Sequence, residues 1–528
     1  MNIVLAGMPG SGKTAAGKLL AKGMARLFID TDSIISSRMN KSITRIFDED
    51  GESFFRRAEG KLCDEISRTN NAVIAVGGGT FLNRNNLIKL TESGIIFTLT
   101  CGLEEILSRI QNEEKKRPLL SGKGRDGLNK MARRRMKLYA GLPNRVDTTG
   151  LSPEKTADVI LSRLRGKEHR LDIEVDGKVS SVMIKNGAAE HPLGFIASFL
   201  RENRIFVVSD SRVFSLYGKK LRSVLEGGGL HSSFFLLQPG ERSKSLTSVK
   251  NIYRWLIREK ASRSSLVLAF GGGVVSDTAG FAVSTFLRGL RWAVMPTTLL
   301  AQVDAGIGGK TGVNIEGGKN QVGTFFFPET VLVDPLLCAT LDRRRMREGL
   351  AEALKSAMVQ DVGLYDLIRD KGRDLLLKDL GLLEEVIVRT AGVKTAIVGH
   401  DPYEMGERKH LNLGHTFGHA LESWFKHRRL THGEAVGLGL LCALRMACEM
   451  GHMEEKVIGE TREILKNLGL PVYLEGLPVR EVVSLMSFDK KREAGLTFVV
   501  PQKCGFVGLE KNVEQDLIIR GLKEVIRD

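Results

Sequence analysis

The amino-acid sequence predicts an α/β protein with parallel sheets, long enough for several domains. Short apolar runs of the β type alternate with stretches of helical periodicity along the chain. Several of these runs end in glycine or polar residues directly before a helical stretch, which is the pattern of strand–loop–helix units. The 528 residues would fill roughly three domains at ~100–200 residues each.

The predicted elements follow this pattern from the N-terminus onward. A second strand ends within Phe28–Asp32, and a helix is predicted at about 153–165, before the charged segment 166–172 that marks a domain boundary. Between 343 and 469 the pattern is mostly helical, which indicates a helical third domain. The other predicted strands are 3–6, 72–76, 95–99, 205–209, 234–237 and 266–270. The predicted domains are 1–168, 172–340 and 341–528.

Composition excludes several classes of protein. Hydrophobic residues make up 42% and charged residues 27%, as in ordinary globular proteins. No apolar run reaches the ~18 residues that a membrane span requires, and the N-terminal apolar run is too short for a signal peptide. The six cysteines are scattered without a C-x-x-C motif, which disfavours a disulfide scaffold. We therefore predict a cytoplasmic protein that does not bind membranes.

The formal net charge of +16 has two interpretations: nucleic-acid binding, or local basic clusters for small anions. The net charge is +10 in residues 1–168 and +6 in 169–528, and residues 115–137 contain ten basic residues and one acid, Asp126. That basic segment contains no aromatic residue on which a base would stack. The charge therefore favours small anionic ligands, and we predict no nucleic-acid partner.

A complete phosphate-binding motif, GMPGSGKT, spans Gly7–Thr14 between the first strand and a helix. Backbone N–H groups of such a loop, here around Gly10 and Gly12, bind phosphate together with the helix N-terminus. Lys13 adds a positive charge, and the Thr14 hydroxyl can ligate Mg²⁺. A plain glycine-rich turn would not need all eight positions, so the motif predicts a nucleotide site.

Further motifs in the first domain suit a second substrate. Asp30 and Asp32 end the second strand, where their i, i+2 spacing would place both carboxylates on one face. The triple glycine 77–79 follows the next strand and lets a ligand approach the backbone closely. Arg117 lies in the basic, glycine-rich segment, which has the composition of a lid. Taken singly, the aspartates also fit a solvated strand end, and the basic segment also fits a solvated loop.

The order of the motifs GxxxxGKT, DTD, FRxxE, GGG, RPLL and RxxLY resembles shikimate kinase over about residues 1–165. This resemblance implies ATP- and Mg²⁺-dependent phosphorylation of the 3-hydroxyl of shikimate. It implies that Asp32 binds a shikimate hydroxyl and that Asp30 lies near magnesium. The other implied shikimate contacts are Arg56, Gly78, Gly79 and Arg135, with both arginines at the carboxylate. The implied catalytic residues are Lys13, Asp32 and the lid arginine Arg117.

A second set of motifs predicts a metal site. His415 and His419 stand four residues apart in LNLGHTFGHALE, which puts both on one face of a helix. His432 follows in THGE, and Glu352 lies in an apolar helical stretch. Imidazoles and a carboxylate suit catalytic Zn²⁺ with an open coordination position. The spacing alone predicts both His415 and His419 as ligands, and the alternative is a group of core histidines.

Glycine-rich and cationic segments suit a dinucleotide and a phosphorylated polyol. The segment GGGVVSD at 271–277 follows a strand and precedes a helix, so it can seat a pyrophosphate although it is not a GxGxxG motif. Segments 209–210 and 239–244 lie at strand ends, where they can reach a ribose or an adenine, although each alone is more often a turn. Residues 288–320 supply many cations and amides.

Together these motifs resemble 3-dehydroquinate synthase over about residues 175–500. The resemblance implies that Glu352, His415 and His432 hold Zn²⁺ or another divalent metal such as Co²⁺, whereas His419 handles a phosphate or a proton near the substrate. The implied NAD contacts are Asp210, Glu241, Lys244, Gly273, Asp277, Thr297, Thr298, Lys310 and Lys319. The implied substrate contacts are Asp304, Lys310, Lys319, Asn320, Lys355, Lys394, Arg408, Asn412 and either Lys490 or Lys491, with Arg288 at the phosphate. The implied catalytic residues are Arg288, Lys310, Lys355 and His419.

The two resemblances imply a fused bifunctional enzyme of the shikimate pathway. Its kinase domain would precede an α/β NAD-binding domain and a mainly helical metal-binding domain. The second activity would convert 3-deoxy-arabino-heptulosonate 7-phosphate into 3-dehydroquinate and phosphate, with NAD recycled. The alternative keeps these folds and changes the substrates, to another sugar-phosphate cyclase fused to another small-metabolite kinase. The resemblance also allows a homodimer through the synthase part.

Overall fold

The computed structural model describes residues 1–111, 135, 138–316, 318–426, 428–486 and 496–527. The chain divides into two compact units, which we describe separately. Unit 1 consists of Met1–Gly166 with the short segments Ala339–Asp342 and Leu377–Leu383. Unit 2 consists of Lys167–Cys338, Arg343–Leu376 and Glu384–Asp528.

Unit 1 contains a five-stranded sheet in which every pair of neighbouring strands is parallel. The strands, in their order across the sheet, are β2 (Leu27–Asp30), β3 (Ala72–Ala75), β1 (Asn2–Gly7), β4 (Gly94–Thr100) and β5 (Arg145–Asp147). Because all strands run the same way, the loops after β1, β2 and β3 meet at one edge of the sheet, where ligands of such folds bind.

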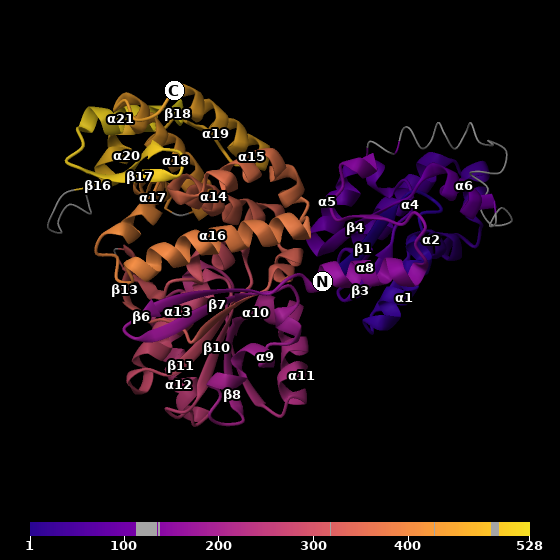
Figure 1. Cartoon of the computed structure of the whole chain (residues 1–528), viewed down its shortest axis with the longest axis horizontal. Coiled ribbons are helices and arrows are strands. Elements are labelled where there is room, and N and C mark those ends of the chain that lie inside the picture. Colours follow the sequence, from indigo (N-terminus) through magenta and orange to yellow (C-terminus); the bar gives the residue numbers. More distant parts are fainter. Residues whose placement is uncertain (112–134, 136–137, 317, 427, 487–495, 528) are drawn as a thin grey trace. The chain divides into compact units, whose positions relative to one another are not determined.

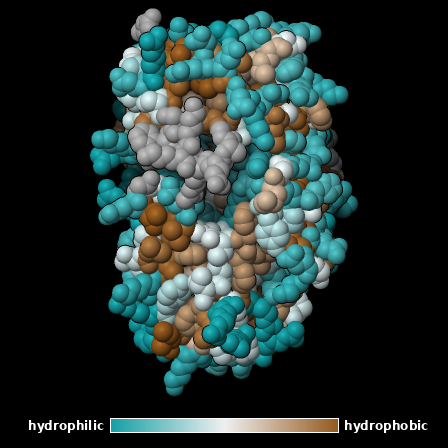
Figure 2. Space-filling model, turned by 90° about the vertical axis from the view of Figure 1, so that its left-hand side faces the viewer, coloured by the Kyte–Doolittle hydropathy of each residue, from teal (hydrophilic) through white to brown (hydrophobic). Residues whose placement is uncertain are grey.

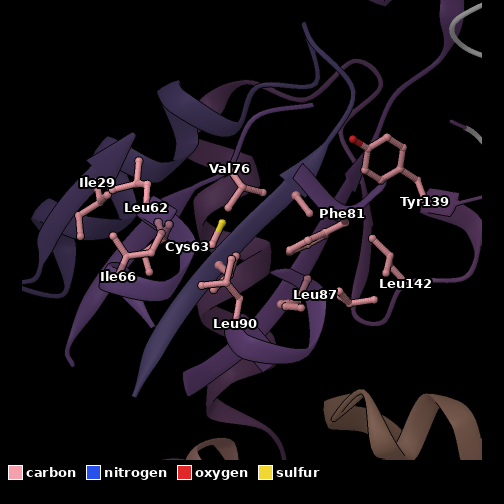
Figure 3. Packing of buried hydrophobic residues seen from close by; sticks show 14 of the residues in the cluster. Ile29, Leu62, Cys63, Ile66, Val76, Phe81, Leu87, Leu90, Tyr139 and Leu142 are labelled. Carbon is pink, nitrogen blue, oxygen red and sulfur yellow. The ribbon is translucent and has the colours of Figure 1, made fainter. Parts of the chain in front are cut away.

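Helices connect these strands (Figure 1). They are α1 (Lys13–Gly23), α2 (Thr31–Met39), α3 (Ile43–Glu49), α4 (Glu52–Ile66), η1 (Thr80–Leu82), α5 (Arg84–Ser93), α6 (Leu103–Gln111) and α8 (Pro153–Arg165). Figure 3 shows Leu62, Cys63 and Ile66 of α4 gathered near Val76 and Leu90 in the buried cluster of this unit. The spacing of these residues on α4 gives the helix one apolar face, which holds it against the sheet.

Unit 2 contains a seven-stranded sheet that is parallel apart from the antiparallel pair β6–β7. The strands in order are β6 (His169–Val175), β7 (Lys178–Ile184), β14 (Thr330–Val333), β11 (Arg291–Pro296), β10 (Leu266–Gly271), β8 (Arg204–Asp210) and β9 (His231–Leu237). The main helices beside this sheet are α11 (Lys219–Gly227), α12 (Leu246–Arg258) and α13 (Gly273–Thr285). Shorter elements are η3 (Ala188–Glu190), α9 (Leu193–Ile196), η4 (Ala197–Phe199), α10 (Ser211–Val213), η5 (Phe214–Gly218), η6 (Glu241–Ser243), η7 (Phe286–Arg288), η8 (Ala301–Ala305), η9 (Pro335–Thr340) and the hairpin β12 (Lys310–Ile315) with β13 (Gly318–Phe325).

The second part of unit 2 is mainly helical and is drawn in orange to yellow in Figure 1. Its helices are α14 (Arg343–Gln360), α15 (Val362–Leu376), α16 (Leu380–His400), η10 (Glu407–Asn412), α17 (His415–Trp424), α18 (His432–Glu449), α19 (Glu455–Leu468), α20 (Val479–Met486) and α21 (Gln515–Lys523). Its short strands are β15 (Leu474–Glu475), β16 (Thr497–Lys503), β17 (Phe506–Lys511) and β18 (Ile526–Arg527).

Glycines bring α17 and α18 into direct backbone contact. A Cβ atom at Gly439 of α18 would lie 2.0 Å from the carbonyl oxygen of Gly414, the residue before α17. Gly414 itself has φ +76°, a conformation that favours glycine. The close approach places the first residues of the two helices, His415 and His432, side by side, with ring centroids 5.2 Å apart.

The structure confirms the predicted α/β class, the predicted strands and the mainly helical character of 343–469. One local prediction is wrong: Asp32 does not extend the second strand. The Asp30 side chain accepts a hydrogen bond from the Ser33 N–H and caps α2, so the chain turns into a helix and Asp32 lies in its first turn.

Among the described residues, no helix is long and apolar enough to cross a membrane. Figure 2 shows that the face of the protein turned toward the viewer is mostly hydrophilic, with separate hydrophobic spots.

Candidate active sites

The phosphate-binding loop of unit 1 lies between β1 and α1. Gly10 and Gly12 have φ of +80° and +92°, which permits the tight path of the loop, and Gly12 caps α1. The Lys13 ammonium donates to the carbonyls of Gly7 and Met8, at 2.9 Å each, so its charge is held within the loop. The loop thus presents a helix N-terminus and a cation together, which is an anion-binding arrangement.

Two predicted magnesium-site residues lie together beside this loop. The Thr14 hydroxyl donates to Asp30 Oδ2 at 2.9 Å, linking the first turn of α1 to the end of β2. Hydroxyl and carboxylate oxygens are ligands that Mg²⁺ prefers. These two groups therefore fit a magnesium ion at the phosphates.

The turn Gly77–Gly79 is bordered by an acid and two guanidinium groups. A Cβ atom at Gly77 would lie 2.6 Å from Asp32 Oδ1, one at Gly78 would lie 3.3 Å from Arg135 Nη1, and one at Gly79 would lie 2.5 Å from Arg56 Nη2. Burial and the nearby Arg56 both lower the pKa of Arg135. The structure thus brings the predicted shikimate contacts of the described residues around one backbone turn, whereas Arg117 lies outside the described residues.

Sequence reasoning missed two side chains of this site. Glu59 is buried and accepts hydrogen bonds from Arg56 at 2.8 Å and from the Thr80 hydroxyl at 2.5 Å, so it fixes the position of the Arg56 guanidinium. Arg109 of α6 donates to the carbonyl of Gly10 at 3.4 Å and to that of Thr148 at 2.9 Å. The FRxxE motif contained the signal for Glu59, because i, i+3 residues of a helix face each other.

In unit 2, most of the predicted nucleotide-binding residues lie at the carboxyl ends of four neighbouring strands, β11, β10, β8 and β9. The others are Asp277 in α13 and Lys310 and Lys319 in the hairpin β12–β13. Thr297 and Thr298 follow β11, Gly271–Gly273 follow β10, Asp210 ends β8, and 241–244 come shortly after β9. A Cβ atom at Gly272 would lie 3.1 Å from Thr298 Cγ2, so little more than backbone separates these loops. This edge, with the N-terminus of α13, is where a dinucleotide binds in such sheets.

A buried ion pair lies below this edge. The Lys244 ammonium contacts Asp277 Oδ2, joining η6 to α13. Burial raises the pKa of Asp277, and the neighbouring Lys244 opposes this effect. Nearby, Asn314 Nδ2 donates to Glu241 at 2.8 Å.

Three predicted metal ligands come together from three helices. Ligand atoms of Glu352 (α14), His415 (α17) and His432 (α18) lie within 4.8 Å of one another. A second set, His419, Glu422 and His432, meets the same criterion, so the two sets share His432 but separate His415 from His419. The His415 and His419 rings are nevertheless neighbours, with centroids 5.4 Å apart.

The Glu352 carboxylate fits a bound cation. Its side chain is 0% exposed, and neither oxygen has a hydrogen-bond partner among the described residues. Lys355 Nζ lies 2.6 Å from Oε2 and His432 Nε2 lies 3.1 Å from Oε1, but these contacts lack hydrogen-bond angles. Burial alone would raise the pKa of Glu352, but Lys355 and His415 outweigh it and lower that pKa. Burial lowers the pKa of His415 to about 3, which leaves a neutral imidazole able to ligate a metal.

A network of buried charges adjoins this group. Lys394 Nζ donates to Asp304 Oδ1 at 2.5 Å, and Lys355 Nζ lies 3.8 Å from the same oxygen. Burial lowers the pKa of Lys394 to about 8, although Asp304 acts in the opposite direction. Lys355 and Lys394 thus lie together beside Asp304, with Glu352 as the second carboxylate of the network, and their two ammonium groups can bind an anionic ligand.

A second cluster joins the hairpin β12–β13 to η10. Lys310 Nζ lies 2.7 Å from Glu404 Oε1, and Asn412 Nδ2 donates to the same oxygen at 3.0 Å. Arg408 is buried and donates to the carbonyl of Gly308 at 2.6 Å. Glu404 therefore bridges two predicted substrate contacts, and sequence reasoning missed it because it lies in an irregular loop with φ +61°.

Not every predicted residue joins these groups. Arg288 is exposed on η7 and makes no hydrogen bond or ion pair with any described residue of the predicted site. Asn320 contributes its backbone N–H to Asn314 Oδ1 at 3.0 Å. Lys490 and Lys491 lie outside the described residues.

Family models match most of the chain. A shikimate kinase model matches residues 9–165. Models of the N-terminal and C-terminal parts of 3-dehydroquinate synthase match residues 234–348 and 349–492.

Among curated proteins, a bifunctional shikimate kinase/3-dehydroquinate synthase of Thermotoga maritima is 34% identical over 492 residues, which are 93% of each chain. A 3-dehydroquinate synthase of Crocosphaera subtropica is 37% identical over 334 residues, covering 62% of this chain and 92% of its own.

Solved structures resemble unit 2. The 2-epi-5-epi-valiolone synthase ValA of Streptomyces hygroscopicus, with NAD⁺ and Zn²⁺ bound, is 30% identical with a TM-score of 0.62, over 66% of this chain and 96% of its own. A 2-deoxy-scyllo-inosose synthase shares the fold at 23% identity, with a TM-score of 0.61, over 68% of this chain and 100% of its own. The order of the two sites along one chain, and the likeness of nearly its whole length to the Thermotoga protein, show that the chain belongs to the family of bifunctional shikimate kinase/3-dehydroquinate synthases.

Proposed function

We propose that unit 1 carries out the kinase reaction, transfer of the γ-phosphoryl group of ATP to the 3-hydroxyl of shikimate, at the turn Gly77–Gly79. The observation that supports this site most is the convergence of Asp32, Arg56 and Arg135 on that turn. The two guanidinium groups would bind the shikimate carboxylate, because a guanidinium pairs with a carboxylate through two parallel hydrogen bonds. Asp32 would accept the proton of the reacting hydroxyl.

The phosphate-binding loop would hold ATP in the same unit. Lys13 and the loop N–H groups would bind the phosphates, and Thr14 with Asp30 would hold Mg²⁺. When bound, Mg²⁺ neutralises charge on the phosphates. The chain's own contribution is the positioning of both substrates, which supplies most of the catalysis in this type of reaction.

We propose that unit 2 carries out the synthase reaction at the group Glu352–His415–His432 and the adjoining lysines. The supporting observation is that this buried group lies in contact with the network of Asp304, Lys355 and Lys394. When bound, NAD and a divalent cation such as Zn²⁺ or Co²⁺ supply reversible oxidation of a substrate alcohol and polarisation of its oxygen. The strand-end residues of the nucleotide edge would hold the NAD.

The remaining residues of unit 2 would bind and orient the sugar phosphate. Lys394 and Arg408 are buried cations that suit the substrate carboxylate. Lys310 and Asn412, which share Glu404, would hold the phosphate once that carboxylate moves away. His419 lies exposed beside His415, where a ring nitrogen can accept or return a proton.

Separate assays of the purified chain test both proposals. With shikimate and ATP we expect shikimate 3-phosphate, and with 3-deoxy-arabino-heptulosonate 7-phosphate, NAD⁺ and Zn²⁺ we expect phosphate and 3-dehydroquinate without net NADH. Inactivity in the second assay with the metal bound would favour another sugar-phosphate cyclase. We further propose a cytoplasmic location. We also propose a homodimer through the synthase part, and light scattering of the intact chain would test this oligomeric state.

A further inference from the structure

We propose that Glu422 is a positioning residue of the synthase site that acts on two groups at once. One carboxylate oxygen orients the metal ligand His432, and the other holds Lys319 of the hairpin β12–β13. This inference rests on the proposed metal site of unit 2. It assigns a function to a residue that the sequence analysis did not single out.

The position of Glu422 is unusual for a charged side chain. It lies on α17, its side chain is 4% exposed, and it follows the apolar residues Ala420 and Leu421. Burying a carboxylate is costly unless hydrogen bonds or opposite charges compensate it. Glu422 has both: Oε2 lies 3.4 Å from His432 Nδ1, and Oε1 accepts from Lys319 Nζ at 3.2 Å.

The two ring nitrogens of His432 face carboxylates from two different helices. Nδ1 faces Glu422 of α17, and Nε2 lies 3.1 Å from Oε1 of Glu352 on α14. With a cation bound at Nε2, the carboxylate at Nδ1 would hold the ring proton on Nδ1 and leave the Nε2 lone pair for the cation. Metal-ligating histidines are commonly fixed in this way by an outer carboxylate.

The hydrogen bonds distinguish an outer role for Glu422 from direct ligation. Both oxygens of Glu422 are engaged, one by an imidazole and one by an ammonium group. Both oxygens of Glu352 lack a hydrogen-bond partner among the described residues. A cation added between the helices would satisfy Glu352 Oε1, which faces His415 and His432, while Oε2 keeps Lys355 at 2.6 Å. At Glu422 both oxygens are already hydrogen-bonded.

The contact with Lys319 ties the substrate side to the metal side. Lys319 stands at the start of β13, in the same hairpin as Lys310 and Asn320. That hairpin begins and ends in the sheet part of unit 2, whereas Glu422 belongs to the helical part. A movement of Lys319 would therefore shift the Glu422 carboxylate, which also orients His432.

Three substitutions in the full-length chain separate the two contacts. Glu422→Gln keeps an oxygen acceptor for His432 Nδ1 but loses the charge that holds Lys319. Glu422→Leu loses both contacts at similar volume. Lys319→Met loses only the cation. The probe is Co²⁺ alone, titrated into metal-stripped protein without NAD or substrate and followed by its visible absorption.

We expect Glu422→Leu to weaken Co²⁺ binding by about 10–100-fold, the usual effect of losing an outer partner of a metal ligand. Glu422→Gln and Lys319→Met should bind Co²⁺ within about threefold of the unchanged chain, because the acceptor at His432 Nδ1 remains. Both should instead raise the KM for the heptulosonate phosphate. Circular dichroism and the midpoint of thermal unfolding of the same samples report whether the chain, unit 2 included, is folded.

Two results would overturn the proposal. The first is unchanged Co²⁺ affinity in Glu422→Leu. The second is a change of the Co²⁺ spectrum in Glu422→Gln together with a loss of affinity as large as in Glu422→Leu, which would make Glu422 a direct ligand. Failure of the proposed synthase function is distinguishable, because the expected Co²⁺ pattern would then persist in a chain that forms no 3-dehydroquinate.

Discussion

The two sites of this chain are built in opposite ways. In unit 1 the site follows the ends of adjacent parallel strands, and most of its residues lie in short contiguous motifs such as Gly7–Thr14 and Gly77–Gly79. In unit 2 the site draws on a hairpin, a sheet edge and helices α14, α16, α17 and α18, and its charges are largely buried in pairs. Local motifs position ligands by backbone geometry, whereas the second site depends on long-range packing and charge compensation.

Removal of the metal should have the largest effect, and it should affect the synthase of unit 2 but not the kinase of unit 1. We expect dialysis against a chelator to abolish phosphate release from 3-deoxy-arabino-heptulosonate 7-phosphate, and Zn²⁺ or Co²⁺ to restore it. The kinase, assayed afterwards with excess Mg²⁺, should be unchanged. Full synthase activity in a protein shown to be metal-free would refute the proposed role of Glu352, His415 and His432.

Glu352→Gln should lower the synthase rate by more than the ~10–100-fold typical of outer-shell changes, because it removes a predicted ligand itself. It also leaves the buried Lys355 without its partner carboxylate at 2.6 Å, and breaking a buried pair costs about 3–5 kcal/mol. The measurement is turnover of both activities with the midpoint of thermal unfolding. Equal loss of both activities would mean that the substitution acts through folding.

Lys13→Ala should lower kinase turnover by about 10²–10³-fold, since it removes the cation that we propose stabilises the transferred phosphoryl group. Synthase turnover should stay the same, because Lys13 belongs to the phosphate-binding loop of unit 1, where it donates to the carbonyls of Gly7 and Met8. A coupled assay of each reaction checks this. A normal kinase rate in Lys13→Ala would contradict the assignment of the loop.

The pH dependence of the synthase should report the buried Lys394. Since burial lowers the pKa of Lys394 to about 8, its ammonium is charged below that pH and becomes neutral above it. We expect kcat/KM for the acidic sugar phosphate to fall as pH rises through about 8, approaching tenfold per pH unit. Lys394→Arg should move the fall to higher pH, because guanidinium stays charged. An unchanged profile in this variant would assign the fall to another group.

The smallest effect concerns the helix caps of the two units. The Thr431 side chain accepts from the Glu434 N–H and forms a capping box at the start of α18, directly before His432. Ser152 caps α8 of unit 1 in the same way, accepting from the Lys155 N–H. Replacing either residue by Ala should lower the free energy of unfolding by about 1 kcal/mol.

Heat-inactivation midpoints of the two activities should shift separately, with Thr431→Ala affecting the synthase and Ser152→Ala the kinase. A shift of both midpoints in either variant would show that the units unfold together.

The same contrast explains what could be predicted from the sequence. The parallel strands and the phosphate-binding loop can be predicted because their signals are local. The group Glu352, His415 and His432 follows from the resemblance to 3-dehydroquinate synthase, whereas spacing alone favours His415 with His419. Asp32 was placed in a strand because Asp30 was not recognised as a helix cap. The hairpin β6–β7 was missed inside a charged segment, although its Asp176-Gly177 turn, with φ of +52° and +72°, is a hairpin signal.

Glu404 and Glu422 were missed for a different reason. Each acquires its role only through partners brought near by tertiary packing: Lys310 and Asn412 for Glu404, His432 and Lys319 for Glu422. No spacing along the sequence encodes these contacts. The one signal available was a glutamate in the otherwise apolar face of α17.

The backbone contact between Gly414 and Gly439 has a consequence for how this protein can vary. With no side chain between the two helices at that point, main-chain contacts fix how closely the start of α17 approaches α18. A Cβ atom at either glycine would clash with main-chain atoms across this contact. The proposed metal site is thus intolerant of change at glycines that would not themselves bind the metal.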